Sequence, residues 1–220
     1  MKKVAVVLCG AGRFDGSEIH ESVLTFLHLS RAGAEVQAFA PDEPQWAVCE
    51  HFKGQPQAGE SRNQLAESAR IARGLVLPLS AADGKNFDAL ILPGGSGAAH
   101  NLCNFATAGA NGDVIPDLQQ LIHSFIQAGK PIGAICIAPA IVALALKGLM
   151  PQLTLGAIHE GPAVEAAKTG AQMVKCAVDE IHVDTKNQIV STPAYILGPD
   201  IAAVDQGIGK LVAQVLELCC

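Results

Sequence analysis

Short β-branched segments alternate along this chain with longer helical segments, and this alternation constrains the fold more than any other feature. Strands separated by helices form a mostly parallel sheet that helices cover on both faces. We therefore expect an α/β fold. The expected strands are Val4–Leu8, Glu35–Phe39, Ala89–Leu92, Ile132–Ile135 and Ile189–Ser191, and the expected helices are Glu18–Arg31, Arg62–Arg73, Val114–Ala128, Pro139–Leu146 and Ile201–Leu218.

The 220 residues are predicted to form one domain, 1–220, because single domains extend to about 250 residues. The chain contains no internal repeat and no block of like charges. The segment 41–59 is irregular and holds three prolines, so we expect an excursion from the sheet with a small hairpin. Ser61 is expected to cap the helix that follows.

Composition narrows the class of partner. Half of the residues are hydrophobic and only 16% are charged, which excludes a disordered chain. The net charge of −6 argues against a nucleic-acid or anionic membrane surface. The longest stretch without a charged residue or a histidine, Pro131–Leu146, is shorter than the roughly 20 residues that a membrane helix needs. A small molecule is the expected partner.

The cysteines point to a reducing compartment. There are seven, an odd number, without any Cys-x-x-Cys pair, and the apolar start Val4–Leu8 is too short for a signal peptide. We expect reduced thiols, a cytoplasmic location, and a terminal helix that ends at Cys219-Cys220. The seven histidines show no metal-ligand spacing, so neither a metal nor another cofactor is expected.

Cys136 occupies the most informative position. An apolar strand ends at Ile135 and a helix begins within about three residues, so Cys136 lies on the sharp turn between them. Such a nucleophile elbow requires small residues two positions away on either side, and here these are Ala134 and Ala138. The amino end of a helix is expected to lower the pKa of the thiol. We interpret Cys136 as a nucleophile.

A glycine-rich turn after another strand completes the pattern. The strand Ala89–Leu92 leads into Pro93-Gly94-Gly95, which lacks the Lys-Ser/Thr of a phosphate-binding P-loop. Bare backbone N–H groups in such a turn can hold an oxyanion. Gly94 and Gly95, together with the N–H of Ile137, are the expected oxyanion-binding groups.

Two carboxylates lie beyond the first strand. Glu18 and Glu21 share one face at the start of a helix, at the edge where open α/β sheets gather their sites. One can complement the helix dipole, and the other can reach the thiol as a proton shuttle. The preceding glycines, from Gly10 to Gly16, contain one residue too many for a dinucleotide fingerprint.

These motifs resemble the PfpI branch of the class I glutamine-amidotransferase-like superfamily. Pro93-Gly94-Gly95, Ala134-Ile135-Cys136 and a glutamate on the first helix carry the resemblance, which covers nearly the whole chain. It implies a flavodoxin-like three-layer sandwich that is often a homodimer. A closer resemblance to the ElbB-type subgroup, named as isoprenoid-biosynthesis glyoxalases with an amidotransferase-like domain, rests on Asp15–Glu21, Gly97-Ala98-Ala99 with Asn101-Leu102, Cys136–Ala140 and Thr192–Tyr195.

The resemblance also implies a function. It implies conversion of glyoxal to glycolate, and of methylglyoxal to lactate, without glutathione or metal, with Glu21 as the carboxylate that faces Cys136. Amidotransferases add a downstream His and Glu two residues apart, whereas this chain has the adjacent pair His159-Glu160. His159 is therefore a weaker candidate, and His182 is expected at the surface. A cysteine-based redox sensor or protein-holding module and a glutaminase subunit remain as alternatives.

Overall fold

One seven-stranded sheet forms the centre of the molecule in the computed structural model, which describes residues 1–198 and 200–219. The strand order is β10-β11-β7-β6-β1-β2-β5, and every neighbouring pair is parallel except β10–β11. The predicted flavodoxin-like α/β fold is confirmed. Its strands are β1 (Lys3–Val7), β2 (Glu35–Ala40), β5 (Val76–Pro78), β6 (Ala89–Leu92), β7 (Ile132–Ile135), β10 (His182–Asp184) and β11 (Ile189–Thr192); β3 (Cys49–Glu50) pairs with β4 (Gln55–Pro56), and β8 (Gln152–Leu153) with β9 (Gln172–Met173).

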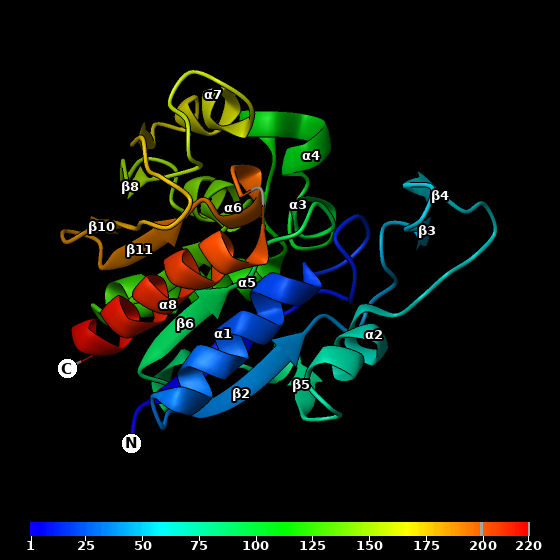
Figure 1. The fold of residues 1–220 in the computed structure, drawn as a ribbon, viewed down its shortest axis with the longest axis horizontal. Helices are drawn as coiled ribbons and strands as arrows, with labels where there is room; N and C mark the ends of the chain where they lie inside the picture. Colours follow the sequence, from blue (N-terminus) through cyan, green and yellow to red (C-terminus); the bar gives the residue numbers. More distant parts are fainter. Residues whose placement is uncertain (199, 220) are drawn as a thin grey trace.

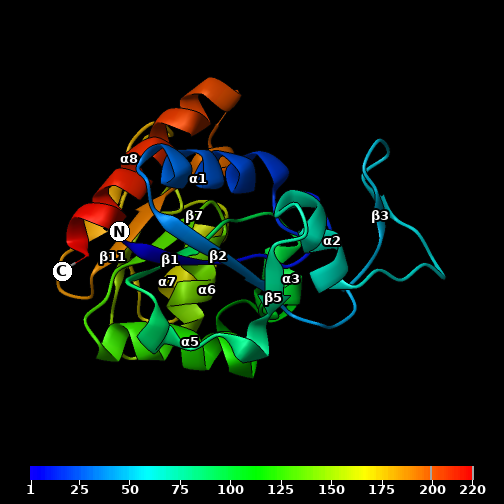
Figure 2. The same cartoon turned by 90° about the horizontal axis from the view of Figure 1, so that it is seen from below.

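Helices cover both faces of the sheet (Figures 1 and 2). On one face α1 and α8 pack against each other, and α5 and α6 lie on the opposite face with the short helices α3, α4 and α7. None of the helices in the described part of the chain is long and apolar enough to cross a membrane. The helices are α1 (Ile19–Arg31), α2 (Gln64–Ile71), α3 (Ala98–Asn101), α4 (Phe105–Ala108), α5 (Pro116–Gln127), α6 (Ala138–Ala145), α7 (Pro162–Ala167) and α8 (Ile201–Leu218).

The central strand β1 shows why the strands are apolar throughout. Val4 and Val6 belong to the core under α1 and α8, while Ala5 and Val7 belong to the core on the other face. All four side chains are fully buried. A strand covered on both faces needs an apolar residue at every position, because successive side chains point to opposite faces.

The long elements were predicted well and the short ones poorly. All five predicted strands and all five predicted helices are present, with ends shifted by at most two residues. Strand β5 and the helices α4 and α7 were missed, because three to six residues are too few to show a period. The predicted cap Ser61 is wrong: α2 begins later, and the side chain of Asn63 accepts the N–H of Ala66 at 2.9 Å.

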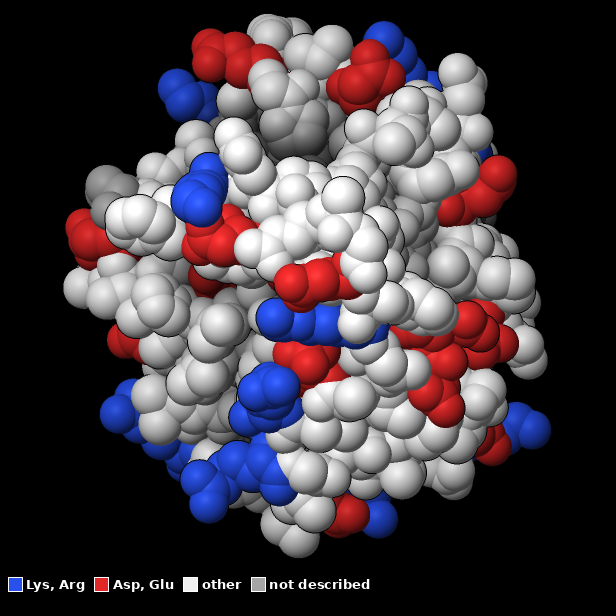
Figure 3. Space-filling model, turned by 90° about the vertical axis from the view of Figure 1, so that its right-hand side faces the viewer, with Lys and Arg blue, Asp and Glu red and all other residues white. Residues whose placement is uncertain are grey.

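The irregular segment 41–63 leaves the sheet after β2 and carries the predicted hairpin, β3–β4. This hairpin projects away from the sheet in both ribbon views (Figures 1 and 2), and Phe52 within it is 96% exposed. On the side seen in Figure 3, acidic and basic side chains lie next to one another. Glu67 accordingly pairs with Arg62 at 3.8 Å and with Arg70 at 2.9 Å.

The close packing of α8 at Gly207 yields a testable expectation. A Cβ atom at Gly207 would overlap the carbonyl oxygen of Val178 and lie 2.8 Å from Oγ1 of Thr192. Alanine normally stabilises a helix interior by about 1 kcal/mol relative to glycine. Here we expect Gly207→Ala to lower the free energy of unfolding by about 1–3 kcal/mol instead, because backbone atoms must move apart. Chemical denaturation measures this change.

Gly209 on the same helix provides the matched control. The three atoms nearest to a Cβ at Gly209 all belong to the side chain of His28, which can move. Gly209→Ala should therefore cost less than Gly207→Ala. Equal effects of the two substitutions would contradict the packing argument.

Candidate active site

Cys136 lies on a strained turn between β7 and α6. Its φ angle is 59°, in the left-handed region that costs roughly 1–2 kcal/mol for a residue with a side chain. Its N–H donates to the carbonyl oxygen of Thr192 at 3.0 Å, which ties the turn to the end of β11. The flanking Ala134 and Ala138 are fully buried. The structure therefore contains the predicted nucleophile elbow.

The glycine-rich turn after β6 lies directly against this cysteine. A Cβ atom at Gly94 would lie 2.6 Å from the Cβ of Cys136 and 2.8 Å from Oε2 of Glu21. Gly95 has a φ of 107°, and a Cβ there would lie 2.6 Å from the backbone nitrogen of Glu18. Glycine is required at both positions because no side chain fits between the two loops.

The N–H groups around the sulfur differ in what they bind. The N–H groups of Gly95 and Ile137 hydrogen-bond to the sulfur of Cys136 and act to lower its pKa. The N–H of Gly94 instead donates to Oε2 of Glu21 at 2.9 Å. The single N–H of Gly94 is therefore engaged by Glu21 in this structure, and an oxyanion-binding role for Gly94 stays a prediction. Gly95 and Ile137 remain as candidates.

Glu21 is the buried partner of Cys136. Its side chain is 0% exposed and hydrogen-bonds to the thiol, and the N–H of Tyr195 approaches Oε1 at 3.4 Å. Burial, followed by the nearby charge of Glu18, raises the pKa of this carboxyl to about 8. Near neutral pH, Glu21 is therefore largely protonated.

Glu18 has a different position from Glu21. Its Oε2 caps α1 by accepting the N–H of Glu21 at 2.8 Å, and its own N–H donates to the carbonyl oxygen of Gly94 at 2.9 Å. Its side chain also lies on the wall of a cavity that reaches Cys136. The two carboxylates thus divide as the sequence suggested, one capping the helix and one facing the thiol.

The expected low pKa of Cys136 is wrong. Burial and the carboxyl of Glu21 raise the pKa of this thiol well above its ordinary value, and the N–H groups of Gly95 and Ile137 only partly offset them. Cys136 is 8% exposed, so water solvates a thiolate poorly. The thiol and the carboxyl form a protonated pair that must lose a proton before the sulfur can attack.

The other cysteines lie away from such a turn. Cys9, Cys49, Cys103 and Cys219 are buried, and Cys176 is half-buried. Burial raises the pKa values of the thiols of Cys9 and Cys103 to about 12 and about 11. They pack as small hydrophobic residues. Cys220 lies outside the described residues.

A cavity of about 540 Å³ opens in front of Cys136. Its wall combines polar and charged side chains with apolar surface. Among its wall residues, His20 and Tyr195 hydrogen-bond to each other, with 2.7 Å between Nδ1 and the phenol oxygen. The wall consists of Arg13, Glu18, His20, Gly95, Ser96, Cys136, Ile137, Tyr195, Ile196 and Gly198.

Sequence reasoning assigned no role to His20 or Tyr195. The two residues are 175 positions apart, and nothing in the local sequence indicates that they meet. His159, which was considered instead, is exposed in the loop before α7 and does not line the cavity. The structure therefore does not bring His159 to Cys136. His182 lies on β10 and is half-buried, away from this wall.

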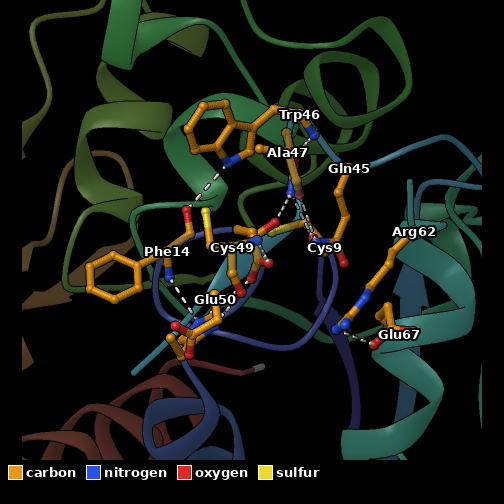
Figure 4. A network of polar contacts seen from close by, with 12 residues as sticks. Cys9, Phe14, Gln45, Trp46, Ala47, Cys49, Glu50, Arg62 and Glu67 are labelled. Carbon is orange, nitrogen blue, oxygen red and sulfur yellow. Dashed lines mark hydrogen bonds and ion pairs between the residues drawn. The ribbon is translucent and has the colours of Figure 1, made fainter. Parts of the chain in front are cut away.

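Residues of the projecting segment 41–63 contact the loop after β1, in which Phe14 follows Arg13 (Figure 4). Cys49 donates its N–H to the buried carboxylate of Asp15 at 2.7 Å, and the indole of Trp46 donates to the carbonyl oxygen of Phe14 at 3.2 Å. The guanidinium of Arg13 in turn lies 4.4 Å from the centre of the Phe14 ring. These contacts place Arg13 at the cavity wall.

No group of His, Cys, Asp and Glu residues within 1–198 and 200–219 is arranged to hold a metal ion. The groups of this site that can act chemically are the thiol, the carboxyls, the imidazole and the phenol. All of them lie at the carboxyl ends of the strands, where sites of open α/β sheets occur.

A parallel sheet with a cysteine at a nucleophile elbow and a glycine turn beside it defines the class: glutamine-amidotransferase-like proteins. Within this class, the sequence pattern of the DJ-1/PfpI family matches residues 2–192. The chain belongs to the DJ-1/PfpI family.

The sequences of several relatives align with nearly the whole chain. The human "Glutamine amidotransferase-like class 1 domain-containing protein 3, mitochondrial" is 47% identical, covering 98% of this chain and 83% of its own length. The rat "ES1 protein homolog, mitochondrial" is 45% identical, covering 98% and 84%. A solved structure of an isoprenoid biosynthesis protein with an amidotransferase-like domain from Ehrlichia chaffeensis is 36% identical, with a TM-score of 0.91 and 99% of each chain covered.

The names of the curated relatives contradict the predicted cytoplasmic location. The human, rat and zebrafish proteins are all named as mitochondrial. The prediction rested on scattered reduced thiols, which indicate a reducing compartment but do not distinguish one such compartment from another.

The raised pKa of Glu21 predicts how stability depends on pH. In the unfolded chain this carboxyl loses its proton above about pH 4.3, whereas the folded protein retains it up to about pH 8. The unfolded state therefore binds fewer protons over this range, and the free energy of unfolding falls as pH rises. We expect the contribution of Glu21 to fall by at most about 1.4 kcal/mol per pH unit. Urea unfolding at a series of pH values measures it.

Glu21→Gln isolates this contribution, because the amide keeps an oxygen for the N–H of Gly94 and has no proton to lose. The difference in stability between the wild type and Glu21→Gln should change across pH 5–8. A constant difference over that range would contradict the raised pKa.

Proposed function

We propose that this chain is a cofactor-independent glyoxalase that converts glyoxal to glycolate. The observation that carries the proposal is the contact between a nucleophile-elbow cysteine and a buried glutamate beside a cavity with polar groups on its wall. The cavity of about 540 Å³ leaves room for a substituent beyond two carbonyl carbons, so methylglyoxal is included as a substrate. The resemblance to ElbB-type proteins agrees with this reaction.

The first step forms a hemithioacetal. Once the pair has lost one proton to solvent, the sulfur of Cys136 adds to one aldehyde carbon, the electron pair of the C=O bond moves to the oxygen, and the thiol proton passes to the Glu21 carboxylate. The N–H groups of Gly95 and Ile137, which already bind the sulfur, can stabilise the developing oxyanion. Glu21 then returns the proton to that oxygen.

The second step moves hydrogen between the two carbons. The first carbon loses a proton to give an enediol, and the second carbon gains one, which leaves a glycolyl thioester on Cys136. Water cleaves the thioester to glycolate and restores the thiol. One carbon is oxidised while the other is reduced, so glyoxal plus water gives glycolate. No external oxidant is needed.

The same geometry argues against the two alternatives. A redox sensor requires an exposed thiol of low pKa, whereas Cys136 is buried and its pKa is raised. A glutaminase requires a histidine that activates the cysteine. His159 does not line the cavity, and the imidazole of His20 on the wall is hydrogen-bonded to Tyr195. An α-oxoaldehyde is more electrophilic than an amide, so it places a smaller demand on the thiol.

The central test is the loss of the nucleophile. Cys136→Ser should reduce glyoxal consumption by at least about 100-fold, because the hydroxyl is a far weaker nucleophile in this buried position. Enzymatic determination of glycolate measures the product. Cys176→Ser provides the matched control, since Cys176 is half-buried and does not line the cavity. Wild-type turnover by Cys136→Ser would refute the mechanism.

A further inference from the structure

The proposed reaction needs a proton carrier that faces the substrate, and Glu21 is placed behind the thiol. Glu21 is fully buried and is absent from the cavity wall. The N–H of Gly94 holds one carboxyl oxygen, and the N–H of Tyr195 approaches the other. Glu21 is therefore positioned to serve the sulfur, while a substrate held in the cavity would present its second carbon to the wall residues.

The titratable groups on the wall differ in what they can do. Arg13 keeps its proton under all ordinary conditions. Glu18 is engaged by the N–H of Glu21 as the cap of α1. His20 and Tyr195 lie on the wall and are joined by a 2.7 Å hydrogen bond between Nδ1 and the phenol oxygen. His20 is also exposed, so it can exchange protons with solvent.

We propose that His20 and Tyr195 are catalytic residues that carry the proton between the two substrate carbons, an inference that rests on the proposed function. Nε2 of His20 takes the proton from the first carbon, whose electron pair forms the C=C bond of the enediol. The oxygen of the second carbonyl takes the phenol proton of Tyr195. The phenol oxygen regains a proton from Nδ1 through the existing hydrogen bond.

The pair returns to its starting state in the second half of the step. Nε2, now protonated, delivers its proton to the second carbon, and the hydroxyl proton of the first carbon passes through Tyr195 to Nδ1. The imidazole changes tautomer in the first half and changes back in the second. No proton is gained or lost overall, and the hemithioacetal becomes the thioester.

The end of β11 connects this pair to the nucleophile. Thr192 accepts the N–H of Cys136, and three residues later Tyr195 directs its N–H towards Glu21 and its phenol towards His20. One short segment thus positions the thiol, its carboxyl partner and the proton carrier. A displacement of this segment would disturb all three together.

The surrounding charges keep the phenol protonated. Burial, together with Glu18 and Glu21 from α1 and Asp200 before α8, raises the pKa of Tyr195 above its ordinary value. The guanidinium of Arg13 and the thiol of Cys136 are the other ionisable groups on this wall. Tyr195 is therefore available as a proton donor at neutral pH.

The test uses His20→Gln and Tyr195→Phe in the full chain, with His159→Gln as the matched control. Glutamine can keep a hydrogen bond to the phenol but cannot relay a proton, and phenylalanine has no hydroxyl proton to donate. Both variants should therefore lower kcat for glyoxal by about 10²–10⁴-fold. Alkylation of Cys136 by iodoacetamide should stay within about twofold of the wild-type rate, because the thiol and Glu21 are unchanged. His159→Gln should match the wild type.

A pH series separates proton transfer from a structural role. The pH profile of kcat for His20→Gln should lack one ionisation that the wild type shows, whereas a change in folding alone would scale the whole profile. Full turnover by His20→Gln or Tyr195→Phe would overturn the assignment of the pair. Loss of turnover together with loss of Cys136 alkylation would also overturn it, because the site itself would then be disrupted.

The proposed function and this inference can be refuted separately. If the wild-type protein forms no glycolate, the glyoxalase proposal is wrong before any variant is compared. If the wild type is active, Cys136→Ser is inactive and His20→Gln is fully active, only the role of the pair is wrong.

Discussion

The structure depends on one backbone turn, in which Cys136 adopts a left-handed conformation between β7 and α6. The turn persists because its N–H is bound by Thr192 and because Gly94 leaves no side chain between the two loops. Through these contacts the ends of three parallel strands, β6, β7 and β11, meet at the sulfur. The sheet therefore does more than bury apolar residues: its register sets which backbone groups surround the nucleophile.

Burial determines the chemistry of this site more than the helix dipole does. The same low-dielectric surroundings raise the pKa values of both Cys136 and Glu21, so the resting pair holds its protons. Such a site avoids a permanently exposed thiolate, and the proposed reaction requires proton transfer in each turnover. A reaction that moves protons between adjacent carbons suits these conditions, and the polar groups on the cavity wall can carry them.

Much of the fold could be predicted, and less of the site. The long strands and helices follow from apolar periodicity, and the elbow follows from Ala134, Cys136 and Ala138. The cap at Asn63 and the short helices α4 and α7 were missed because local patterns there are ambiguous. The pKa of Cys136 was predicted in the wrong direction, because position at a helix start is visible in the sequence while the degree of burial is not.

The sequence by itself determined the parallel α/β architecture, the position of the nucleophile and the candidate carboxylates, because each depends on residues close together in the chain. Only the tertiary structure decided which atoms meet. It committed the N–H of Gly94 to Glu21, excluded His159 from the cavity, and joined His20 to Tyr195 across 175 positions. The physical reason is that hydrogen bonds and desolvation depend on distances between elements, which the order of residues along one element does not specify.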